Sequence, residues 1–512
     1  MWTEAWRSRF RAAAAEIRFD VLVIGGGITG AGIALEAARA GLRVALVEQN
    51  DFASGTSSWS SKLVHGGLRY LASGDWRLTR ESVRERQRLM HDLPGLVSPL
   101  DFMLPVYAHD KPGRWALTAA LGVYDLMAGR RYSHYMKPSA FDAYLPYLNA
   151  EALKGGFVFR DAVTDDVRLT LRVLIEAAEH GALAANYVRA EQLIFEDDTV
   201  VGAHVTDTQA GESFDIHAAC VINATGPWSD RVRERVDAAP QLRPLRGSHF
   251  VFPFHALPVA RAITLFHPDD RRPLFAIPWQ GATVFGTTDL DHEQPMDEPP
   301  RMSAAESEYL IAAARHYFPS RGLQATDALS TFAGVRPVVR GEPGASASQE
   351  SRESVIDVDK GLISVTGGKL TTFRVTAHEV LDRVGKILGR RFALDTDAPI
   401  VQTGTATAGS VRHGPHYAAM PTNEDDAVRL DTTDYCRREL RFASTHEAVA
   451  HLDDLMLRRT RAGLLLANGG LDELPALAPL ICDALGWDDA RWQTEVARYR
   501  AHWQHVRALA KK

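Results

Sequence analysis

The sequence predicts an α/β fold in which two domains are interleaved along the chain and an all-helical domain follows them. Three observations predict it. The chain opens with an apolar strand, a glycine-rich turn and a helix, in the order of a βαβ unit. Short strands that end at glycine-containing turns recur much later, near residues 220 and 362. Beyond residue 425 the apolar residues recur at helical spacing instead.

The composition is that of a soluble globular enzyme, with 46% hydrophobic and 24% charged residues among 512. This length predicts two or three domains, because single cores stop growing near about 250 residues. A net charge of −6 argues against nucleic acid as a partner, since its binders carry a concentrated basic face. Three scattered cysteines predict neither a disulfide framework nor a metal site, and they favour a reducing, cytoplasmic compartment. The longest uncharged stretch, 21–35, is too short to span a bilayer.

The first segment, 1–18, predicts a small basic amphipathic helix. Aromatic residues recur at helical spacing, and arginines lie between them: Trp2, Trp6, Phe10, Arg7, Arg9 and Arg11. Such a helix either lies on an anionic membrane surface or packs against its own domain. The sequence leaves both interpretations open.

The first domain is expected to be assembled from three separated pieces, 19–80, 160–240 and 330–400. Its predicted elements are the strand Phe19–Ile24, the helix Ile28–Ala40 and the strands Arg43–Val47, Cys220–Asn223 and Leu362–Val365. Segments 81–159 and 241–329 are expected to form the second, α+β domain, which binds the substrate. Within it, His249–Phe254 and Thr283–Thr287 have the pattern of strands.

A linker is expected at 401–425, where Gly, Thr, Ser, Pro and His replace the periodic apolar residues. The all-helical domain then covers 426–512. Ser444 followed by Glu447 matches a capping box at the start of a helix. Near the end, a stripe at 3-4-3-4 spacing predicts a packing face: Trp492, Val496, Tyr499, Trp503 and Val506.

The glycine-rich turn predicts a Rossmann-like site for a dinucleotide. Gly25, Gly27 and Gly30 follow a strand and open a helix, and Glu48 follows at the end of the second strand. The first glycine makes the tight turn, the second admits the pyrophosphate and the third allows close packing of helix and sheet. The helix N-terminus offers free N–H groups to phosphate, and the carboxylate accepts hydrogen bonds from ribose hydroxyls.

Two further segments favour FAD over a nicotinamide dinucleotide. The hydroxyl-rich stretch 54–70 follows the ribose acid directly and suits a cofactor that runs deep into the protein. Ala224-Thr225-Gly226 closes a second strand and offers a second close approach of the backbone to the cofactor. A metal cofactor is not expected.

The chain resembles the FAD-dependent glycerol-3-phosphate dehydrogenases, the bacterial respiratory enzymes of the D-amino-acid-oxidase-like flavoprotein group. The resemblance runs in order over residues 19–470, and its most specific part is Ser60-Ser-Lys-Leu-Val-His-Gly-Gly-Leu-Arg-Tyr70. Other matching segments begin at Ile24, Ala224, Gly247, Gly286, Ala333, Gly367 and Leu457. The resemblance and the motifs together give these expected cofactor-binding residues: Gly25, Gly27, Ile28, Thr29, Gly30, Glu48, Gln49, Thr56, Ser57, Ser61, Lys62, Leu63, His65, Gly66, Gly67, Ala224, Thr225, Gly226, Gly334, Gly368, Lys369, Leu370 and Thr371.

The resemblance implies oxidation of a phosphorylated polyol, sn-glycerol 3-phosphate, to dihydroxyacetone phosphate by hydride transfer to N5 of FAD. It also implies that electrons pass to a membrane quinone, and that the enzyme lies peripherally on the inner, cytoplasmic face of the cell membrane. A homodimer is expected as well, although no residue pattern carries that expectation.

Alcohol oxidation needs a base, and the imidazoles of His65 and His249 are the candidates, with His65 slightly preferred for its place beside the cofactor loop. Arg336 is a third possibility, as a group that orients the substrate or polarises its alcohol. Guanidinium groups suit phosphate, so Arg69 and Arg336 are expected to bind it, with Tyr70 as a further donor. Lys369 is expected to stabilise reduced flavin or to reach the substrate.

Three other functions compete with this one. An oxidase that passes electrons to oxygen shares the family's fold, but the insertion typical of such oxidases is not found. A flavoenzyme that oxidises an amine or amino acid would share the cofactor site. The third alternative is a non-catalytic flavin-binding protein, against which the retained histidines, arginines and Lys369 argue.

Overall fold

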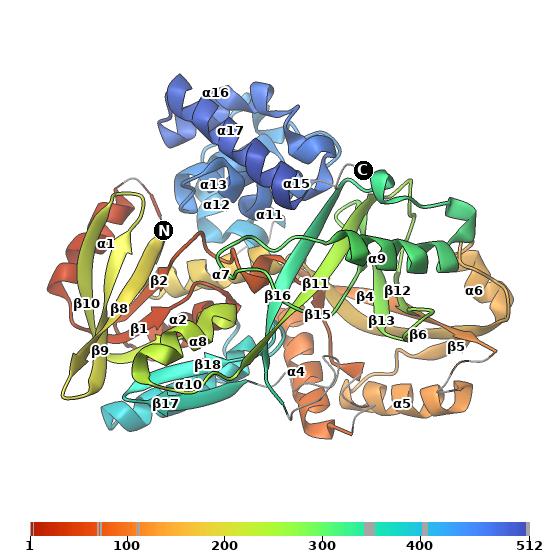
Figure 1. Cartoon of the computed structure of the whole chain (residues 1–512), viewed down its shortest axis with the longest axis horizontal. Helices are drawn as coiled ribbons and strands as arrows, with labels where there is room; N and C mark the ends of the chain where they lie inside the picture. The colour runs from red at the N-terminus through yellow and green to blue at the C-terminus, as the bar shows by residue number, and fades with distance from the viewer. Residues whose placement is uncertain are drawn as a thin grey trace.

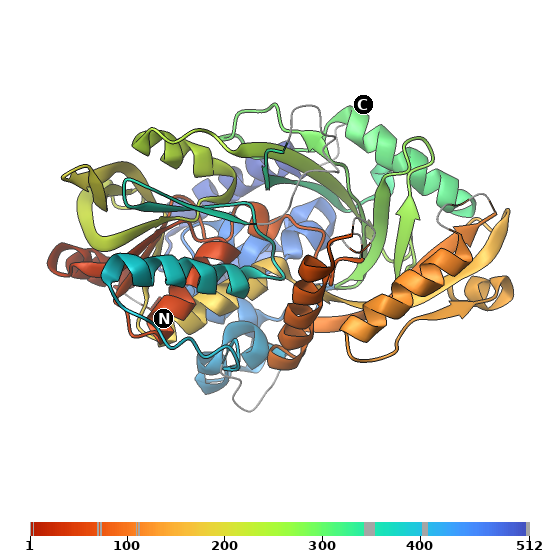
Figure 2. The same ribbon diagram turned by 90° about the horizontal axis from the view of Figure 1, so that it is seen from below.

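The computed structural model describes residues 2–3, 5–68, 71, 74–108, 110, 113–341, 354–401 and 408–507. Two β-sheets lie side by side, and helices of the C-terminal part lie over the junction between them (Figure 1). The view from below shows the same two sheets with the C-terminal helices behind them (Figure 2).

The first sheet has the strand order β17-β18-β10-β1-β2-β7, and β18, β10, β1, β2 and β7 run parallel. Its strands are β1 (Phe19–Ile24), β2 (Val44–Glu48), β7 (Leu183–Asn186), β10 (Glu212–Asn223), β17 (Val355–Asp359) and β18 (Leu362–Thr366). A ribbon of β8 (Val188–Glu196) and β9 (Thr199–Asp207) extends from the start of β10. The predicted strands and helix of the opening βαβ unit are thus present within one residue of their expected bounds.

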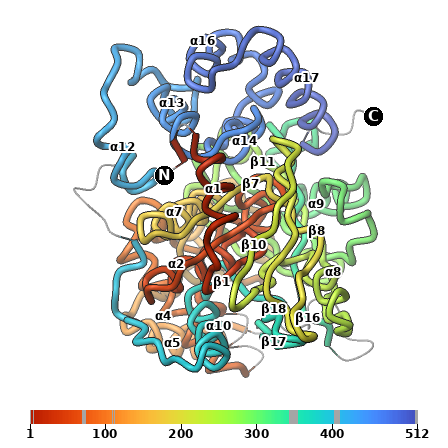
Figure 3. Tube along the Cα trace, turned by 90° about the vertical axis from the view of Figure 1, so that its left-hand side faces the viewer, coloured from red at the N-terminus to blue at the C-terminus, as the bar shows by residue number. Residues whose placement is uncertain are grey.

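Alternation along β1 explains how both faces of this sheet are covered. Val21 and Val23 pack with the helices α2 (Ile28–Arg39), α7 (Asp166–Glu179) and α10 (Phe373–Leu388). Leu22 and Ile24 point to the opposite face, which α1 (Trp6–Glu16) and the β8–β9 ribbon cover. Figure 3 looks onto this side, with α1 in front of the sheet. Because both faces are buried, the strands read as continuous apolar runs.

The N-terminal segment packs against its own domain. Phe10 is buried, and the indole N–H of Trp2 donates to the carbonyl of Ala184 at 2.7 Å. Arg7 and Arg11 both pair with Asp207. Trp2, Phe10, Arg7 and Arg11 therefore contact the protein, whereas Arg9 is exposed.

The second sheet has the strand order β15-β11-β14-β13-β12-β4-β6-β3, with β16 paired to β11 and β5 to β6. Its strands are β3 (Leu63–Val64), β4 (Val97–Tyr107), β5 (His134–Met136), β6 (Leu153–Thr164), β11 (Leu242–Pro253), β12 (Ala262–Phe266), β13 (Pro273–Trp279), β14 (Ala282–Gly286), β15 (Leu290–Asp291) and β16 (Ser330–Val339). One face packs on α6 (Pro138–Tyr144) and α9 (Ala304–Tyr317). The other packs on α4 (Trp76–Asp92), α5 (Arg114–Met127) and the C-terminal helices.

The expected division of the chain differs here from the structure. β16 lies in the piece 330–400 that we assigned to the cofactor domain, yet it pairs with β11 along its whole length in the second sheet. The last residues of β6 and the short β3 also belong to that sheet. A small helix, α8 (Ser229–Arg233), follows β10.

The C-terminal part is helical, as predicted, with helices α11 (Ala408–His413), α12 (Pro415–Ala419), α13 (Arg437–His446), α14 (Leu452–Asp454), α15 (Ala462–Leu465), α16 (Leu474–Leu485) and α17 (Asp489–Val506). On α17, Trp492, Tyr499, Trp503 and Val506 are buried, which confirms the packing face. The expected linker is partly helical, since α11 and α12 lie within it; residues 402–407 fall outside the described part.

The capping box expected at Ser444 and Glu447 is wrong. Ser444 lies inside α13, which begins after Cys436, and the Glu439 carboxylate accepts from the backbone N–H of Cys436. Glu447 follows the helix and is fully buried, where it forms a two-point ion pair with Arg168 of α7. Its partner lies 279 residues away in the sequence, so the local spacing pointed to the wrong role.

Candidate functional site

The carboxyl ends of the parallel strands of the first sheet bring the glycine turn, the ribose acid and two later turns to one edge. β1 leads into Gly25, β2 ends at Glu48, β10 leads into Ala224 and β18 into Gly367. Ligands of open α/β sheets bind outside these strand ends. The segments that the sequence singled out are therefore neighbours in space.

The glycine turn is built for close approach of backbones. Gly25 has φ +117°, and a Cβ there would lie 2.4 Å from the carbonyl oxygen of Ala224. A Cβ on Gly30 would lie 1.9 Å from the carbonyl oxygen of Gly25. The turn passes directly into α2, whose first residues, Ile28 and Thr29, present the helix N-terminus. This arrangement fits a pyrophosphate held by backbone N–H groups.

Glu48 is held by the turn that it is expected to serve. Its carboxylate accepts from the backbone N–H of Gly26 at 2.8 Å and from that of Asn50 at 2.9 Å. Burial raises the pKa of this carboxyl. A carboxylate in this position suits ribose hydroxyls, because they donate hydrogen bonds that replace those lost from water on burial.

The hydroxyl-rich loop is tied down mainly by its own side chains. The Ser57 hydroxyl accepts from the backbone N–H of Ile28 at 2.9 Å, at the helix N-terminus, and Thr56 donates to the carbonyl of Val335 at 2.5 Å. Lys62 is fully buried, and its ammonium donates to both carboxylate oxygens of Asp166 at 2.9 Å. Burial and the nearby Arg461 guanidinium lower the pKa of Lys62 to about 7. The side chain of Lys62 thus anchors the loop to α7.

His249 lies on β11 and is 2% exposed. Its Nε2 is 2.9 Å from the hydroxyl of Ser61, and its ring stacks on Phe332 at 4.6 Å. Within the described residues its Nδ1 has no hydrogen-bond partner. Burial, together with the charges of Arg336 and Lys62, lowers the pKa of His249 well below its ordinary value. The imidazole is therefore neutral at pH 7, and one ring nitrogen is available.

Arg336 lies on β16, four residues after Phe332, the residue opposite His249. Its guanidinium contacts the Asp289 carboxylate at 2.7 Å and the Thr287 hydroxyl at 3.0 Å. Gly247 makes room for it, because a Cβ there would lie 2.5 Å from the guanidinium nitrogen. The side chain is 23% exposed, so the group is oriented yet accessible.

The remaining candidates lie where the two sheets meet. The hydroxyl of Thr371 donates to the carbonyl of His65 at 3.5 Å, which joins the loop after β3 to the turn before α10. Gly368, in the same turn, has φ +93°, and the half-buried Lys369 and Leu370 follow it. Arg69 and Tyr70 lie outside the described residues.

Several of the expected cofactor residues have other neighbours in this structure. Leu63 is a buried strand residue, and a Cβ on Gly334 would meet the carbonyl oxygen of Trp59 at 2.4 Å. A Cβ on Gly66 would lie 2.3 Å from the hydroxyl oxygen of Tyr124. At Gly334 and Gly66, neighbouring protein atoms therefore explain why a side chain would not fit. Gly67 has φ +77°, and Gly226, with φ +57°, begins a short 3₁₀ helix that follows Thr225.

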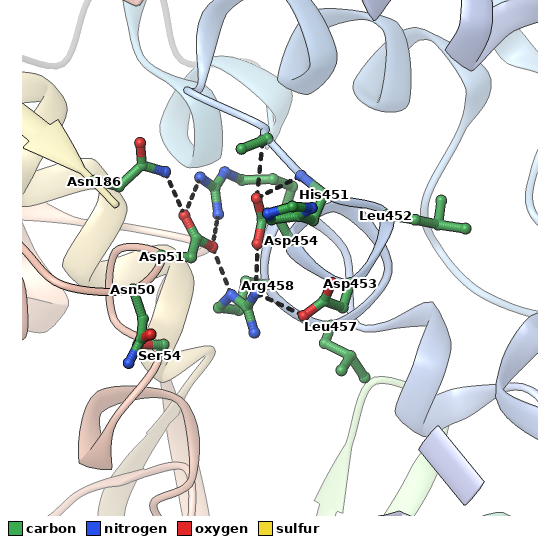
Figure 4. A network of polar contacts seen from close by, with 12 residues as sticks. Asn50, Asp51, Ser54, Asn186, His451, Leu452, Asp453, Asp454, Leu457 and Arg458 are labelled. Carbon is green, nitrogen blue, oxygen red and sulfur yellow. Dashed lines mark hydrogen bonds and ion pairs between the residues drawn. The ribbon is translucent and has the colours of Figure 1, made fainter. Parts of the chain in front are cut away.

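Sequence reasoning missed a buried ionic cluster behind the ribose acid. Asp51 is 1% exposed, and Arg458 and Arg459 both contact its carboxylate, at 2.5 Å from the nearest nitrogen of each (Figure 4). Arg458 also pairs with Asp454, and Asn186 donates to Asp51 at 2.8 Å. Leu455–Arg459 is a π-helical turn, and its two consecutive arginines both reach the same carboxylate. The only signal for it was the Leu457-Arg-Arg-Thr-Arg461 segment of the resemblance.

Two family models match this chain. One, described as "FAD dependent oxidoreductase", matches residues 20–383. The other, described as "C-terminal domain of alpha-glycerophosphate oxidase", matches residues 414–492. Together they cover both sheets and most of the helical part.

The chain is similar to the aerobic glycerol-3-phosphate dehydrogenase of Bacillus subtilis, with 37% identity over 440 residues, 84% of this chain and 79% of that protein. It is 32% identical to a probable mitochondrial glycerol-3-phosphate dehydrogenase of Caenorhabditis elegans over 94% of this chain and 73% of that protein. A glycerol-3-phosphate dehydrogenase of Bacillus halodurans solved with FAD superposes with a TM-score of 0.79 at 28% identity, covering 99% of this chain and 98% of that one.

Proposed function

Because this chain belongs to the FAD-dependent glycerol-3-phosphate dehydrogenase family, we propose that His249 is the base in the oxidation of sn-glycerol 3-phosphate to dihydroxyacetone phosphate. FAD, when bound at the glycine turn, supplies the acceptor for the hydride that leaves C2 of the substrate. His249 takes the proton of the C2 hydroxyl. The observation that carries this assignment is a buried, neutral imidazole with one nitrogen beside Ser61 and the other without a partner in the described part.

Arg336 supplies the positive charge that the substrate needs. Its guanidinium binds the carboxylate of Asp289, and the side chain is exposed enough for a phosphate or the substrate oxygen to reach it. The dianionic phosphate raises the proton affinity of His249 when it binds nearby, because it offsets the cationic neighbours that depress it. Substrate binding therefore strengthens the base.

Anaerobic flavin reduction tests the choice between His249 and His65. Holoenzyme variants His249→Gln and His65→Gln are mixed with sn-glycerol 3-phosphate in a stopped-flow instrument, and bleaching of the flavin band is followed. We expect His249→Gln to reduce flavin about 10²- to 10⁴-fold more slowly than wild type. The His65→Gln variant should keep most of the rate. The reverse order would assign the base to His65.

We further propose a membrane quinone as the electron acceptor and a peripheral position on the cytoplasmic face of the membrane. Within the described ranges, no helix is long and apolar enough to cross a membrane. Support comes from α5, which exposes Trp115, Ala119, Gly122 and Leu126 at 4-3-4 spacing. The exposed fractions of Trp115 and Leu126 are 78% and 80%.

The surroundings of α5 favour an anionic lipid surface. Residues 115–124 carry no charge, and Asp125 is buried, where it accepts from the backbone N–H groups of Tyr132 and Ser133. Exposed Arg114, Arg130 and Arg131 flank the apolar face. An apolar face between basic ends is the pattern of a helix that lies in the membrane interface. In Figure 1 this helix lies on the side of the molecule opposite α16 and α17.

Rapid mixing also tests the acceptor. Enzyme reduced anaerobically by substrate is mixed with a soluble quinone or with air-saturated buffer. Fast reoxidation by quinone and slow reoxidation by oxygen are expected, and the opposite order would identify an oxidase. The expected homodimer stays a prediction, which light scattering of the holoenzyme tests.

A further inference from the structure

Glu306 is a buried carboxylate on the first turn of α9, and it lies across the second sheet from His249. Side chains alternate between the two faces along β11. Arg246 and Ser248 point to the face that α9 covers, where both contact Glu306. His249 points to the other face, where its ring stacks on Phe332. Glu306, which is 1% exposed, therefore contacts the strand of the catalytic histidine from the face opposite the imidazole.

The carboxylate of Glu306 binds more groups than the start of a helix requires. Its Oε2 accepts from the backbone N–H of Ser303 at 2.9 Å, as in a capping box, and pairs with the Arg246 guanidinium at 2.8 Å. Its Oε1 accepts from the hydroxyls of Thr288 at 2.7 Å and Ser248 at 2.8 Å. Burial alone would raise the pKa of Glu306, but hydrogen bonds from Ser303, Thr288 and Arg246 lower it. The group is therefore ionised at neutral pH and can only accept hydrogen bonds.

Thr288 connects Glu306 to the guanidinium of Arg336. Its hydroxyl has two partners, because it donates to Glu306 and accepts from the backbone N–H of Ser248 at 2.9 Å. Its carbonyl accepts from the guanidinium of Arg336 at 3.4 Å. The hydroxyl of Thr287 donates to the same carbonyl at 3.0 Å. Thr288 is thus held by Glu306 through its side chain and contacts Arg336 through its backbone.

The two neighbours of Thr288 hold the guanidinium of Arg336. One terminal nitrogen donates to the hydroxyl of Thr287 at 3.0 Å, and the other to the carboxylate of Asp289 at 2.7 Å. Residues 287–289 form the short segment between β14 and β15, so their position depends on what fixes Thr288. A shift of this segment would move the guanidinium, and a misplacement of about 1 Å can cost about 10²-fold in rate.

We propose that Glu306 is a positioning residue for the oxidation, which acts through Thr288 to hold segment 287–289 and thereby Arg336. The inference rests on the proposed role of Arg336 in binding the substrate. Because Glu306 lies on the other face of the sheet, it orients the guanidinium and leaves contact with the substrate to Arg336. Arg246 balances the charge of the carboxylate, so the contact with Thr288 is additional to the ion pair.

Anaerobic flavin reduction of the holoenzyme tests the proposal. The second-order rate constant of reduction by sn-glycerol 3-phosphate is measured in a stopped-flow instrument. Thr288→Val keeps the shape of the side chain but removes its hydroxyl, and should lower this constant at least about tenfold. Thr288→Ser, which keeps the hydroxyl, should retain the wild-type constant. Ser248→Ala removes the other hydroxyl that donates to Oε1, and as the matched control it should leave the constant unchanged.

A double-mutant cycle with Arg336→Ala separates positioning from a structural defect. If Thr288 acts through Arg336, Thr288→Val should lower the rate constant of wild type but not that of Arg336→Ala. A structural defect would lower both. Glu306→Gln should behave in the same way as Thr288→Val. Its melting temperature is measured as well, because it removes the charge that pairs with Arg246.

The outcomes distinguish this inference from the proposed function. A wild-type rate constant in Thr288→Val, or additive losses in the double variant, would overturn the positioning role and leave that of Arg336 intact. A wild-type rate constant in Arg336→Ala would overturn the role of Arg336 and the positioning role with it.

Discussion

Arg336 owes its orientation to residues that no local pattern connects to it. Asp289 is 47 positions away in sequence and holds the guanidinium in an ion pair, while Gly247 opens the space that it fills. The resemblance selected Arg336, but the partner and the space come from the pairing of β11 and β16. Asp289 and Thr287 thus hold the guanidinium through both of its terminal nitrogens.

Replacing Arg336 with alanine should lower kcat/KM for sn-glycerol 3-phosphate by about 10²-fold, because charge-assisted hydrogen bonds are worth about 1.5–3 kcal/mol each. Flavin content, measured as the ratio of flavin to protein absorbance, should stay unchanged. Arg340→Ala, near the end of the same strand region, is the control and should keep wild-type turnover. Loss of flavin from the Arg336 variant would show that this residue holds the cofactor instead.

At the scale of elements, the cofactor loop depends on a turn that belongs to the C-terminal part. The π-helical turn Leu455–Arg459 supplies two guanidinium groups to Asp51, three residues after the ribose acid. Despite burial, these two arginines lower the pKa of Asp51 to about 2. The loop is thereby fixed electrostatically.

The Asp51 cluster predicts acid sensitivity. A depressed carboxyl pKa contributes stability that is present above the unfolded value, near 3.8, and lost as pH falls through about 2. The pH-dependent part of this stability is about 2 kcal/mol. Asp51→Asn should therefore melt below wild type at pH 7, and the difference should shrink as pH falls below about 4. Scanning fluorimetry measures it, with the exposed Asp434→Asn as control; a difference independent of pH would contradict the role.

The sequence predicted local elements well and their partners poorly. The opening βαβ unit was confirmed because the apolar run of β1 and the turn at Gly25 act over a few residues. Glu447 was misread because its partner Arg168 is far away in the chain, and β16 was placed in the wrong domain because strand pairing is not a local property. Fold class, cofactor and enzyme class are confirmed by the family matches. The roles of His249 and Arg336 stay predictions.

At the scale of the whole molecule, two opposite sides differ in what they expose. The C-terminal helices cover the junction of the sheets on one side, and α5 presents its apolar face on the other (Figure 1). The N-terminal segment, which the sequence left open as a membrane-binding helix, buries Trp2 and Phe10 against its own domain. An apolar segment indicates a membrane-binding surface only where the structure shows that its side chains are exposed.

Vesicle binding tests the α5 surface. The double variant Trp115→Glu/Leu126→Glu should lose most of its co-sedimentation with vesicles that contain anionic phospholipid, because it places charge on the face that enters the interface. Turnover with a soluble quinone should be unchanged. Phe195→Glu, at an exposed apolar position on β8, is the control. Binding that survives the double variant would assign membrane contact to another surface.

The pairing of Asp51 with Arg458 has a consequence for the order in which the protein matures. The two residues are separated by 407 positions, so a ribosome completes the glycine turn long before the counter-charges of its neighbouring loop emerge. The loop holds an unneutralised aspartate until the end of synthesis, and contacts of such long range form late. Cofactor uptake is therefore expected after release of the chain, and a nascent chain stalled before residue 458 should remain colourless.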